Sequence, residues 1–394
     1  MTPYKHQTEI AKQGYEIIKS HGLVYLAMLE RTGKTLTAIL IAEMSKANSI
    51  LIITKKNAMN GWKDTLDKYE HISKQYELIN YHSVHKISST SKFDLVIVDE
   101  SHSSGMATYP KKSILYKNVE KITKKLPIIF LSATPYAESK SQLYHQLGLT
   151  SYSPFNEYKN FYDWFKTYGI PKQIFVGGRF MNLYNDTIDF MHEIDHLFIK
   201  YTRKELGFEH EPNDVIHYID LGLNTKKLYN QLLNDQITII DGHELVCDSS
   251  MKLRTSLYMI EGGTVKINDD ITLDICNREK INYIKSNFKE NVAIMAHFVG
   301  EQEMLKKYFK NVYSSTSHAE GVDLSHIDEL VVYSMDFSTA RFIQRRARQA
   351  NMKRDKPINV HFLLVKGAIS EQVYNSVAVK KENFTNSCFE RSTL

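Results

Sequence analysis

Two apolar segments in the first hundred residues are each followed by a polar motif of a different kind. Residues 23–29 precede a Gly-Lys-Thr sequence at 33–35, and residues 95–98 precede an Asp-Glu pair at 99–100. Short segments that are apolar along their whole length are typical of strands in a buried parallel sheet. The chain is therefore expected to be an α/β protein in which buried strands end in polar motifs.

Strand and helix signals alternate throughout residues 1–150, which predicts a parallel-sheet domain. A helix is expected over residues 35–47, because Leu36, Ile39, Leu40 and Met44 fall on one face. Connections between its parallel strands should be right-handed. Strands are expected at residues 23–29, 50–54, 78–81, 95–98 and 128–132.

The same alternation returns near the C-terminus and predicts a second parallel-sheet domain over residues 276–394. Residues 219–275 are expected to be a transitional segment or linker leading into it, with a helix at 226–233 and a hairpin or loop at 261–270. In the second domain, strands are expected at 292–295, 330–333 and 360–365, and helices at 301–309 and 340–349.

Residues 151–218 differ from both flanking regions and predict a small helical, aromatic insertion. Eight aromatic residues lie between positions 152 and 168, and several are spaced as on one helix face. Most of them should belong to a core, and stacking of one or two on nucleic acid is the alternative.

Composition excludes several classes of protein. The 394 residues carry a net charge of +5, which permits a nucleic-acid partner without requiring one. Cys247, Cys276 and Cys388 are far apart, so neither a zinc site nor a disulfide framework is expected. The N-terminus has no apolar signal core, and no segment has the length of a membrane span, so we expect a cytoplasmic protein with no membrane partner.

The Gly-Lys-Thr sequence predicts a phosphate-binding loop for ATP and Mg²⁺. Backbone N–H groups of the loop residues Arg31, Thr32 and Gly33 should face the phosphates. Lys34 should reach the β- and γ-phosphates, and the Thr35 hydroxyl should bind Mg²⁺. The usual pattern has a glycine five positions before Gly33, where this chain has a methionine.

The two acids at the end of the later strand predict the catalytic half of the same site. Asp99 should hold Mg²⁺, and Glu100 should orient and deprotonate the attacking water. Adjacent carboxylates repel each other unless a metal ion or a proton offsets their charge. A solvated acidic turn is the structural alternative.

With these motifs in order, the chain resembles superfamily 2 helicases and DNA translocases, most of all compact phage proteins of the Swi/Snf type. Phage UvsW-type branched-DNA helicases are a neighbouring possibility. The sequence Asp-Glu-Ser-His at 99–102 resembles the DExH box. Ser132-Ala133-Thr134-Pro135 resembles the motif that links hydrolysis to domain movement. The resemblance implies two RecA-like domains in tandem and a monomeric motor.

The resemblance also implies binding residues. Gln7 occupies the position of the adenine-contacting glutamine, and Thr54 and Lys55 lie in a segment that grips one DNA strand. In the second domain the implied binding residues are Thr316 and Ser317 for nucleic acid and Gly321 and Asp323 for the nucleotide.

The arginine-finger motif of the family matches only in part. The usual motif reads Gln-x-x-Gly-Arg-x-x-Arg, but Ala347 replaces the glycine and Asn351 the second arginine. Arg348 is the candidate finger, with Arg345 or Arg346 as a substitute for the missing arginine. Plain phosphate binding or a solvated helix face is the alternative for this basic cluster.

The resemblance therefore predicts an ATP-dependent DNA helicase or translocase acting on forked, branched or duplex DNA. Its expected setting is replication, recombination with branch migration, or repair in a phage, and hence the host cytoplasm. An RNA helicase is the alternative within the class. A P-loop kinase or small-molecule ATPase, and a non-hydrolysing DNA-binding clamp, are the alternatives from other classes.

Overall fold

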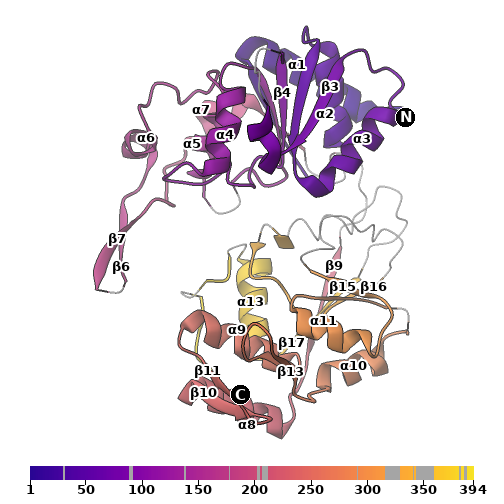
Figure 1. Cartoon of the computed structure of the whole chain (residues 1–394), viewed down its shortest axis with the longest axis vertical. Coiled ribbons are helices and arrows are strands. Elements are labelled where there is room, and N and C mark those ends of the chain that lie inside the picture. The colour runs from indigo at the N-terminus through magenta and orange to yellow at the C-terminus, as the bar shows by residue number, and fades with distance from the viewer. Residues whose placement is uncertain are drawn as a thin grey trace. The chain divides into compact units, whose positions relative to one another are not determined.

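The computed structural model divides the chain into two compact units, residues 1–207 and 208–394 (Figure 1). Each unit is built on its own parallel sheet with helices around it. The structure describes residues 1–29, 32–87, 92–136, 139–176, 178–201, 205, 212–290, 292–315, 329–339, 341–342, 359–380, 383–385 and 388–394.

The sheet of the first unit has six parallel strands in the order β3-β2-β4-β5-β1-β8. Five of them confirm the strands expected from the apolar segments, with ends that differ by a few residues. The sixth, β8, was not expected and adds to the edge beside β1. Their bounds are β1 Leu23–Met28, β2 Ser49–Thr54, β3 Gln75–Asn80, β4 Leu95–Asp99, β5 Ile128–Leu131 and β8 Phe198–Tyr201.

Both faces of this sheet are buried, which explains why its central strands are apolar throughout. Helix α1 packs against α2 and β1. Gly22 ends α1 in the left-handed conformation with φ +71°, and a side chain there would overlap the ring of Tyr152. The helices are α1 Lys5–His21, α2 Lys34–Met44, α3 Met59–Lys68, α4 Ile114–Thr123, α5 Gln142–Leu147, α6 Phe161–Tyr168 and α7 Met191–Ile194, with 3₁₀ turns at Lys56–Ala58, Tyr81–Lys86 and Asp195–Leu197.

The aromatic segment is part of the core of the first unit, as most of its residues were expected to be. Trp164 is fully buried and its ring contacts those of Phe155, Phe161 and Phe190. The segment is only partly helical, because a two-stranded antiparallel hairpin follows α6. Its strands, β6 Lys172–Val176 and β7 Arg179–Leu183, extend away from the sheet (Figure 1).

The second unit contains a five-stranded parallel sheet in the order β15-β14-β16-β17-β9. It confirms the expected strands near 292, 330 and 360. Residues 261–270 enter a hairpin, as expected. The strands are β9 Asn213–Tyr218, β10 Ile237–Ile240, β11 His243–Val246, β12 Thr264–Lys266, β13 Thr272–Asp274, β14 Ala293–Ala296, β15 Val312–Ser314, β16 Glu329–Val332 and β17 Asn359–Leu364.

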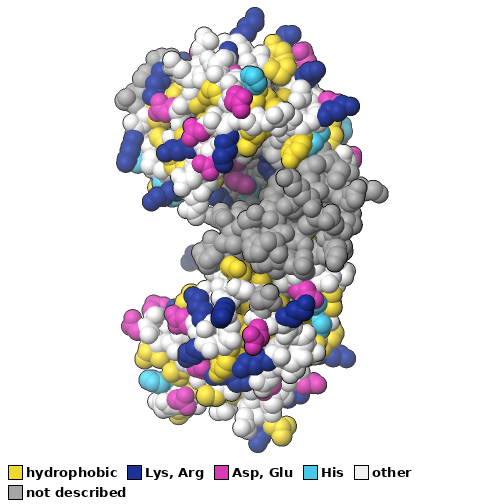
Figure 2. Space-filling view, turned by 90° about the vertical axis from the view of Figure 1, so that its right-hand side faces the viewer, with side chains coloured by type: hydrophobic (Ala, Val, Ile, Leu, Met, Phe, Trp, Pro, Cys, Tyr) yellow, Lys and Arg dark blue, Asp and Glu magenta, His cyan; other side chains and the backbone are white. Residues whose placement is uncertain are grey.

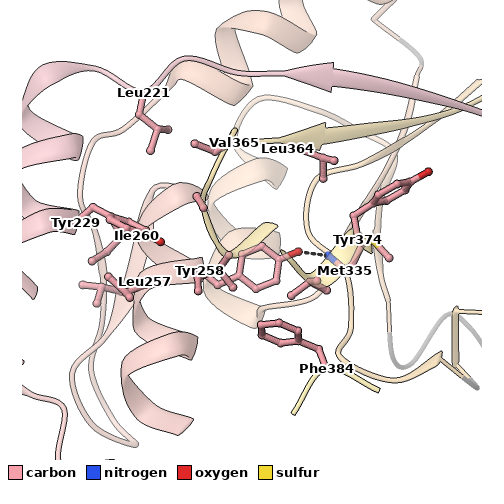
Figure 3. Close-up of a cluster of buried hydrophobic side chains, with 14 of the residues drawn as sticks. Leu221, Tyr229, Leu257, Tyr258, Ile260, Met335, Leu364, Val365, Tyr374 and Phe384 are labelled. Atoms are coloured by element: carbon pink, nitrogen blue, oxygen red, sulfur yellow. Dashed lines mark hydrogen bonds between the residues drawn. The ribbon is translucent and has the colours of Figure 1, made fainter. Parts of the chain in front are cut away.

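Helices α8 and α9 pack together beside this sheet and contribute to its larger core. In that core the Tyr258 hydroxyl accepts a hydrogen bond from the Met335 backbone N–H at 2.7 Å (Figure 3). The bond ties α9 to the turn after β16. The helices are α8 Leu223–Asp235, α9 Ser250–Glu261, α10 Glu279–Asn287, α11 Val299–Lys306 and α13 Ile369–Tyr374, followed by a π-helical turn at Asn375–Val379. The expected helix at 340–349 lies almost entirely outside the described residues.

The observed boundary differs from the expected division at 150, 218 and 275. Strand β8 returns the end of the aromatic segment to the first sheet, and β9 already belongs to the second sheet. The chain therefore changes unit at residues 207–208. The sequence misplaced this point because β8 and β9 pair with strands far away in the chain. Both units nevertheless have the α/β parallel-sheet architecture expected for two RecA-like domains in tandem.

Among the described side chains visible in Figure 2, basic residues are spread among acidic ones. Within the described ranges, no helix combines the length and the apolar character needed to cross a bilayer.

Replacing Trp164 with alanine should destabilise the first unit by about 3–5 kcal/mol, because the substitution empties a fully buried site. Tyr162, which lies on the same helix and is 43% exposed, is the matched control. Its replacement by alanine should cost about 1 kcal/mol through the lost ring contact with Tyr184. Urea unfolding, followed by the fluorescence of Trp62, measures the free energy of unfolding of both variants. Equal losses of stability would contradict the burial of Trp164 in an aromatic core.

Candidate active site at the carboxyl edge of the first sheet

Three chemically different loops leave the first sheet at one edge. Strands β4 and β5 pair in parallel with Asp99 opposite Leu131, and β5 pairs with β1 with Leu131 opposite Leu26. The phosphate loop after β1, the acids at the end of β4 and the Ser132 loop after β5 therefore emerge side by side. Ligand sites in open parallel sheets lie at this carboxyl edge.

The phosphate loop ends in a left-handed glycine at the start of α2. Gly33 has φ +82°, and a Cβ there would lie 2.0 Å from the Gln7 amide nitrogen, so only glycine fits. The Lys34 ammonium group donates a hydrogen bond to the Met28 carbonyl at 2.7 Å. Thr35 is half-buried in the first turn of α2. Met28, which stands where the usual pattern has glycine, thus contributes its backbone carbonyl as the partner of Lys34.

Two polar side chains brace this loop from within. Gln7 is buried, accepts from the Tyr4 N–H at 2.8 Å and donates to the Gly33 carbonyl at 3.2 Å. Thr32 donates to the Leu29 carbonyl at 2.6 Å. Gln7 therefore lies beside the phosphate loop, and its predicted contact with adenine stays a prediction. Arg31, the other predicted loop residue, lies outside the described residues.

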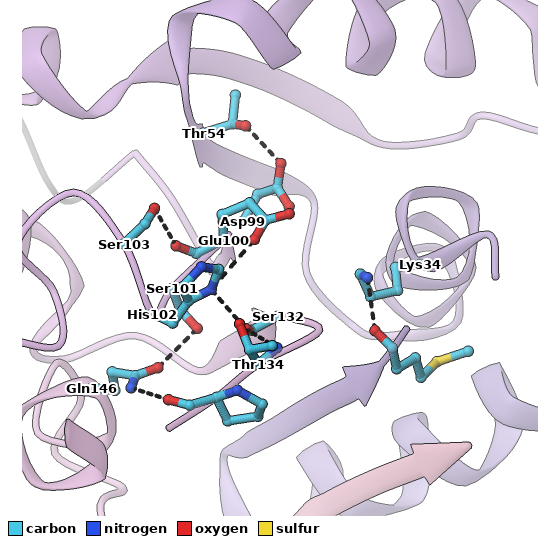
Figure 4. A network of polar contacts seen from close by, with 12 residues as sticks. Lys34, Thr54, Asp99, Glu100, Ser101, His102, Ser103, Ser132, Thr134 and Gln146 are labelled. Atoms are coloured by element: carbon cyan, nitrogen blue, oxygen red, sulfur yellow. Dashed lines mark hydrogen bonds and ion pairs between the residues drawn. The ribbon is translucent and has the colours of Figure 1, made fainter. Parts of the chain in front are cut away.

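Asp99 is held by two donors that converge on one carboxylate oxygen. The Thr54 hydroxyl donates to Oδ2 at 2.7 Å (Figure 4). The Trp62 indole N–H donates to the same oxygen at 2.9 Å. Burial and then the neighbouring Glu100 carboxylate raise the pKa of Asp99, while these hydrogen bonds and Lys34 oppose that rise. The two donors fix the orientation of a carboxylate that burial alone would drive towards protonation.

Glu100 sits in a conformation that side chains rarely adopt, with φ +52°. Such a backbone costs about 1–3 kcal/mol, and residues of this kind cluster at functional sites. Its Oε2 atom is buried, lies 3.3 Å from the His102 Nδ1 atom and makes no hydrogen bond among the described residues. The strained turn therefore presents an acceptor atom without a donor at the carboxyl edge.

His102 connects the acids to the loop after β5. Its Nδ1 atom lies 2.7 Å from the Ser132 hydroxyl, which also accepts from the Thr134 backbone N–H at 3.0 Å. Burial, together with Lys55 and Lys34, lowers the pKa of His102 to about 3, so the ring is neutral at ordinary pH. The predicted linking residues Ser132 and Thr134 are thus in direct contact with the acid motif or with each other. The Thr134 hydroxyl is buried and has no hydrogen-bond partner among the described residues.

A second, fully buried network ties the same loops to the strand of the phosphate loop. The Tyr25 hydroxyl lies 2.7 Å from the Ser101 hydroxyl and donates to the Gln146 side-chain oxygen at 2.7 Å. The Gln146 amide nitrogen donates to the Pro135 carbonyl at 2.6 Å (Figure 4). These hydrogen bonds join β1, the acid motif, the loop after β5 and α5.

Sequence reasoning did not find Tyr25 or Gln146. Tyr25 lies within an apolar segment and Gln146 lies on the short helix α5, which also carries Gln142 and His145. Both side chains are buried, and buried polar groups require hydrogen-bond partners. The Trp62 side chain is buried as well, and its indole N–H reaches Asp99.

Thr54 and Lys55 were expected to contact nucleic acid. The Thr54 side chain is instead fully buried and bonded to Asp99, because β2 lies next to β4 and ends at the same edge. Lys55 is half-buried, and its charge acts on His102. The Thr54 side chain thus belongs to the acid site and does not face solvent.

The predicted residues of the second unit, Thr316, Ser317, Gly321, Asp323, Arg345 and Arg348, all lie outside the described residues. In the described part of the second unit, polar residues gather at the carboxyl edge of the sheet. His297 follows β14 and its Nδ1 atom lies 3.0 Å from the Ser315 hydroxyl. The buried Asp336 accepts from the Arg341 guanidinium at 2.9 Å.

The first-unit site fits a nucleotide triphosphate with a divalent cation. The left-handed glycine and the start of α2 form a typical phosphate cradle. A hydroxyl on Thr35 and a carboxylate on Asp99 are the oxygen ligands that Mg²⁺ prefers. The Glu100 and Thr134 oxygens without protein partners would find them in such a group and its waters.

Comparison with known families gives one match. Residues 54–137 match the family described as type III restriction enzyme, res subunit. The matched stretch contains the acid motif and the Ser132 loop, and it supports the coarser part of the resemblance, a superfamily 2 helicase. No curated protein matches the chain significantly.

Solved structures with similar folds include two DNA complexes. The Sulfolobus solfataricus SWI2/SNF2 ATPase core in complex with dsDNA has a TM-score of 0.47 and 13% identity, covering 96% of this chain and 91% of that one. The ATP-dependent type ISP restriction-modification enzyme LlaBIII bound to DNA has a TM-score of 0.48 and 14% identity, covering 93% of this chain and 28% of that one.

Replacing His102 with glutamine should make the first unit less sensitive to acid. An unfolded histidine takes up a proton below pH 6.5, whereas folded His102 stays neutral down to about pH 3. Its contribution to stability is therefore present above pH 6.5 and declines as the pH falls, by about 2 kcal/mol between pH 7 and pH 5.

Urea unfolding at the two pH values measures this loss through the fluorescence of Trp62 and Trp164, the two tryptophans of the chain, which both lie in the first unit. The glutamine variant should lose about 2 kcal/mol less than the wild type on acidification. A variant of the exposed His71, also to glutamine, should behave as the wild type. Identical acid sensitivity in all three proteins would contradict a buried neutral His102.

Proposed function

We propose that this protein is an ATP-dependent DNA helicase or translocase. The observation that supports the proposal best is the contact between two motifs with different tasks, the acid motif and the Ser132 loop. The His102 Nδ1 atom lies 2.7 Å from the Ser132 hydroxyl. The Gln146 side chain hydrogen-bonds both the Tyr25 hydroxyl of β1 and the Pro135 carbonyl. A simple phosphate-transfer enzyme needs the carboxylates, but it does not need the acid motif to be bonded through His102 to a separate loop that could transmit movement.

The residues of the first unit then have distinct tasks. Lys34, now on the Met28 carbonyl, would exchange this bond for the β- and γ-phosphates, while the Arg31, Thr32 and Gly33 N–H groups hold the phosphate chain. Thr35 and Asp99 would hold Mg²⁺. Bound Mg·ATP supplies the transferable γ-phosphoryl group and charge neutralisation.

Glu100 would accept the proton of the attacking water. Its Oε2 atom, which makes no hydrogen bond to the described residues, is the group suited to this task. A change in the position of Glu100 would reach Ser132 through the neutral His102 ring, because a 2.7 Å hydrogen bond resists separation. Ser132 and Thr134 would in this way link hydrolysis to movement.

The second unit would supply the remaining residues of the proposed motor. We assign Arg348, with Arg345 as the substitute, to the transition-state charge on the γ-phosphoryl group, and Gly321 and Asp323 to the nucleotide. Lys55, Thr316 and Ser317 would contact the nucleic-acid backbone, so binding should depend strongly on salt and little on base sequence.

The finer assignments extend the family resemblance. We propose forked, branched or duplex DNA as substrate, in recombination or repair, for a monomeric motor of the compact phage Swi/Snf type in the host cytoplasm. The similar solved structures are DNA complexes by their descriptions, which agrees with a DNA partner. RNA is the alternative nucleic acid.

Replacing Lys34 with alanine should abolish ATP hydrolysis by removing the phosphate ligand. Replacing Glu100 with glutamine should lower turnover at least about 100-fold, because the amide cannot accept the proton of water. Steady-state hydrolysis is measured without nucleic acid and with single-stranded DNA, duplex DNA, a synthetic fork and RNA. Wild-type turnover should rise most with DNA.

The matched control is Glu120→Gln, which removes a carboxylate charge on α4 in the same unit and should leave hydrolysis unchanged. Hydrolysis that no nucleic acid stimulates would contradict a translocase and favour a small-molecule ATPase. An absence of hydrolysis in the wild type, with DNA binding intact, would favour a non-hydrolysing clamp. Stronger stimulation by RNA would reassign the substrate.

A further inference from the structure

The β6–β7 hairpin presents two large aromatic side chains to solvent. Phe175 is 65% exposed and Phe180 is 72% exposed, although phenylalanine is among the residues most often buried. The two residues are paired across the strands, and their ring centroids are 5.0 Å apart. Figure 1 shows the hairpin extending away from the rest of the first unit.

The strand register places these rings on one face together with two amides. Phe175 is opposite Phe180, and two positions further from the turn Gln173 is opposite Asn182. Because side chains alternate along a strand, the two pairs share a face. The Gln173 amide donates to the Asn182 side-chain oxygen at 2.8 Å. One face therefore combines ring planes with donors and acceptors suited to nucleobases.

The hairpin is anchored firmly at its base. The Ile170 N–H donates to the Asp186 carbonyl and the Ile188 N–H donates to the Tyr168 carbonyl, both at 2.8 Å. These bonds extend the two-stranded ladder to Tyr168, which is buried in the aromatic core. The aromatic segment itself is therefore structural, and it supports the exposed ring pair at a fixed position.

The charge of this region favours a polyanion as its partner. No acidic residue occurs between Asp163 and Asp186, whereas Lys172 and Arg179 lie on the hairpin strands, on the face opposite the rings. The Lys172 ammonium group lies 3.8 Å from the Asp186 carboxylate at the base of the hairpin. Aromatic rings combined with cationic side chains are the usual means of binding single-stranded nucleic acid without sequence preference. An apolar protein partner would not account for the bias in charge.

We propose that the β6–β7 hairpin stacks nucleobases on Phe175 and Phe180 and is the element at which a DNA duplex separates. This inference rests on the proposed function and adds to it the site of strand separation. The ring face would cover the last base pair at a fork, while Lys172 and Arg179 would bind the phosphates of the departing strand.

The test uses the full-length protein and a forked DNA with 5-iododeoxyuridine at the junction, a base that crosslinks to adjacent aromatic residues on irradiation. Crosslinks should map to the tryptic peptides 173–179 and 180–200, which contain Phe175 and Phe180. Replacing both residues with alanine should remove these crosslinks and weaken fork binding at least about tenfold. Strand separation should be lost, while ATP hydrolysis stimulated by single-stranded DNA should be retained.

Two matched variants separate stacking from other roles. Replacing both phenylalanines with tyrosine preserves the rings and should preserve fork binding. Replacing both with leucine preserves apolar surface without rings and should behave as the alanine variant. Wild-type fork binding and strand separation in the leucine variant would overturn the inference. The inference would also be overturned if the wild-type protein self-associates and the alanine substitutions dissociate it into monomers.

The outcomes also separate this inference from the proposed function. Crosslinks on the hairpin without any stimulation of hydrolysis by nucleic acid would retain the binding site and reject the motor. In the opposite case, nucleic acid stimulates hydrolysis, the alanine variant separates strands as the wild type does, and the crosslinks map elsewhere. This result would support the motor and reject the role of the hairpin.

Discussion

Parallel backbone pairing of β1, β5 and β4 is the constraint on which the candidate site depends. It brings the ends of three strands to one edge, although Lys34 and Asp99 are far apart in sequence. Because both faces of the sheet are buried, a register shift would disrupt the close packing on each of them, so the strand ends are fixed relative to one another. The phosphate loop, the acids and the Ser132 loop follow these strands directly and are therefore aligned with one another.

Burial determines how the polar groups at this edge behave. The hydrogen bonds from Thr54 and Trp62 orient Asp99 and oppose the rise in its pKa that burial causes. His102 stays neutral because burial, and then the charges of Lys55 and Lys34, lower its pKa. A neutral ring can bond to Ser132 without competing for the carboxylates. In a low-dielectric site, such hydrogen-bonded networks are stiff, and stiffness suits the proposed link between hydrolysis and movement.

The aromatic segment shows how a core can support a functional surface. Trp164 and Tyr168 are buried among other rings, and the hairpin ladder begins at Tyr168. Two strands alone are marginally stable in water, so the exposed pair Phe175 and Phe180 depends on this anchor. Their cross-strand contact stabilises the hairpin to a modest degree, and the stacking proposal assigns a use to their exposure.

The sequence alone determined the strand pattern, because whole-length apolar segments are a local signal of burial, and it located Lys34, Asp99 and Glu100 through their positions after strands. It did not determine the boundary near residue 207, since β8 and β9 are recognised only by their distant partners. Nor did it separate buried from exposed aromatic residues. Tertiary structure decided that Thr54 faces Asp99, that Gln146 reaches Tyr25 and that Phe175 is exposed, because each depends on contacts between segments distant in the chain.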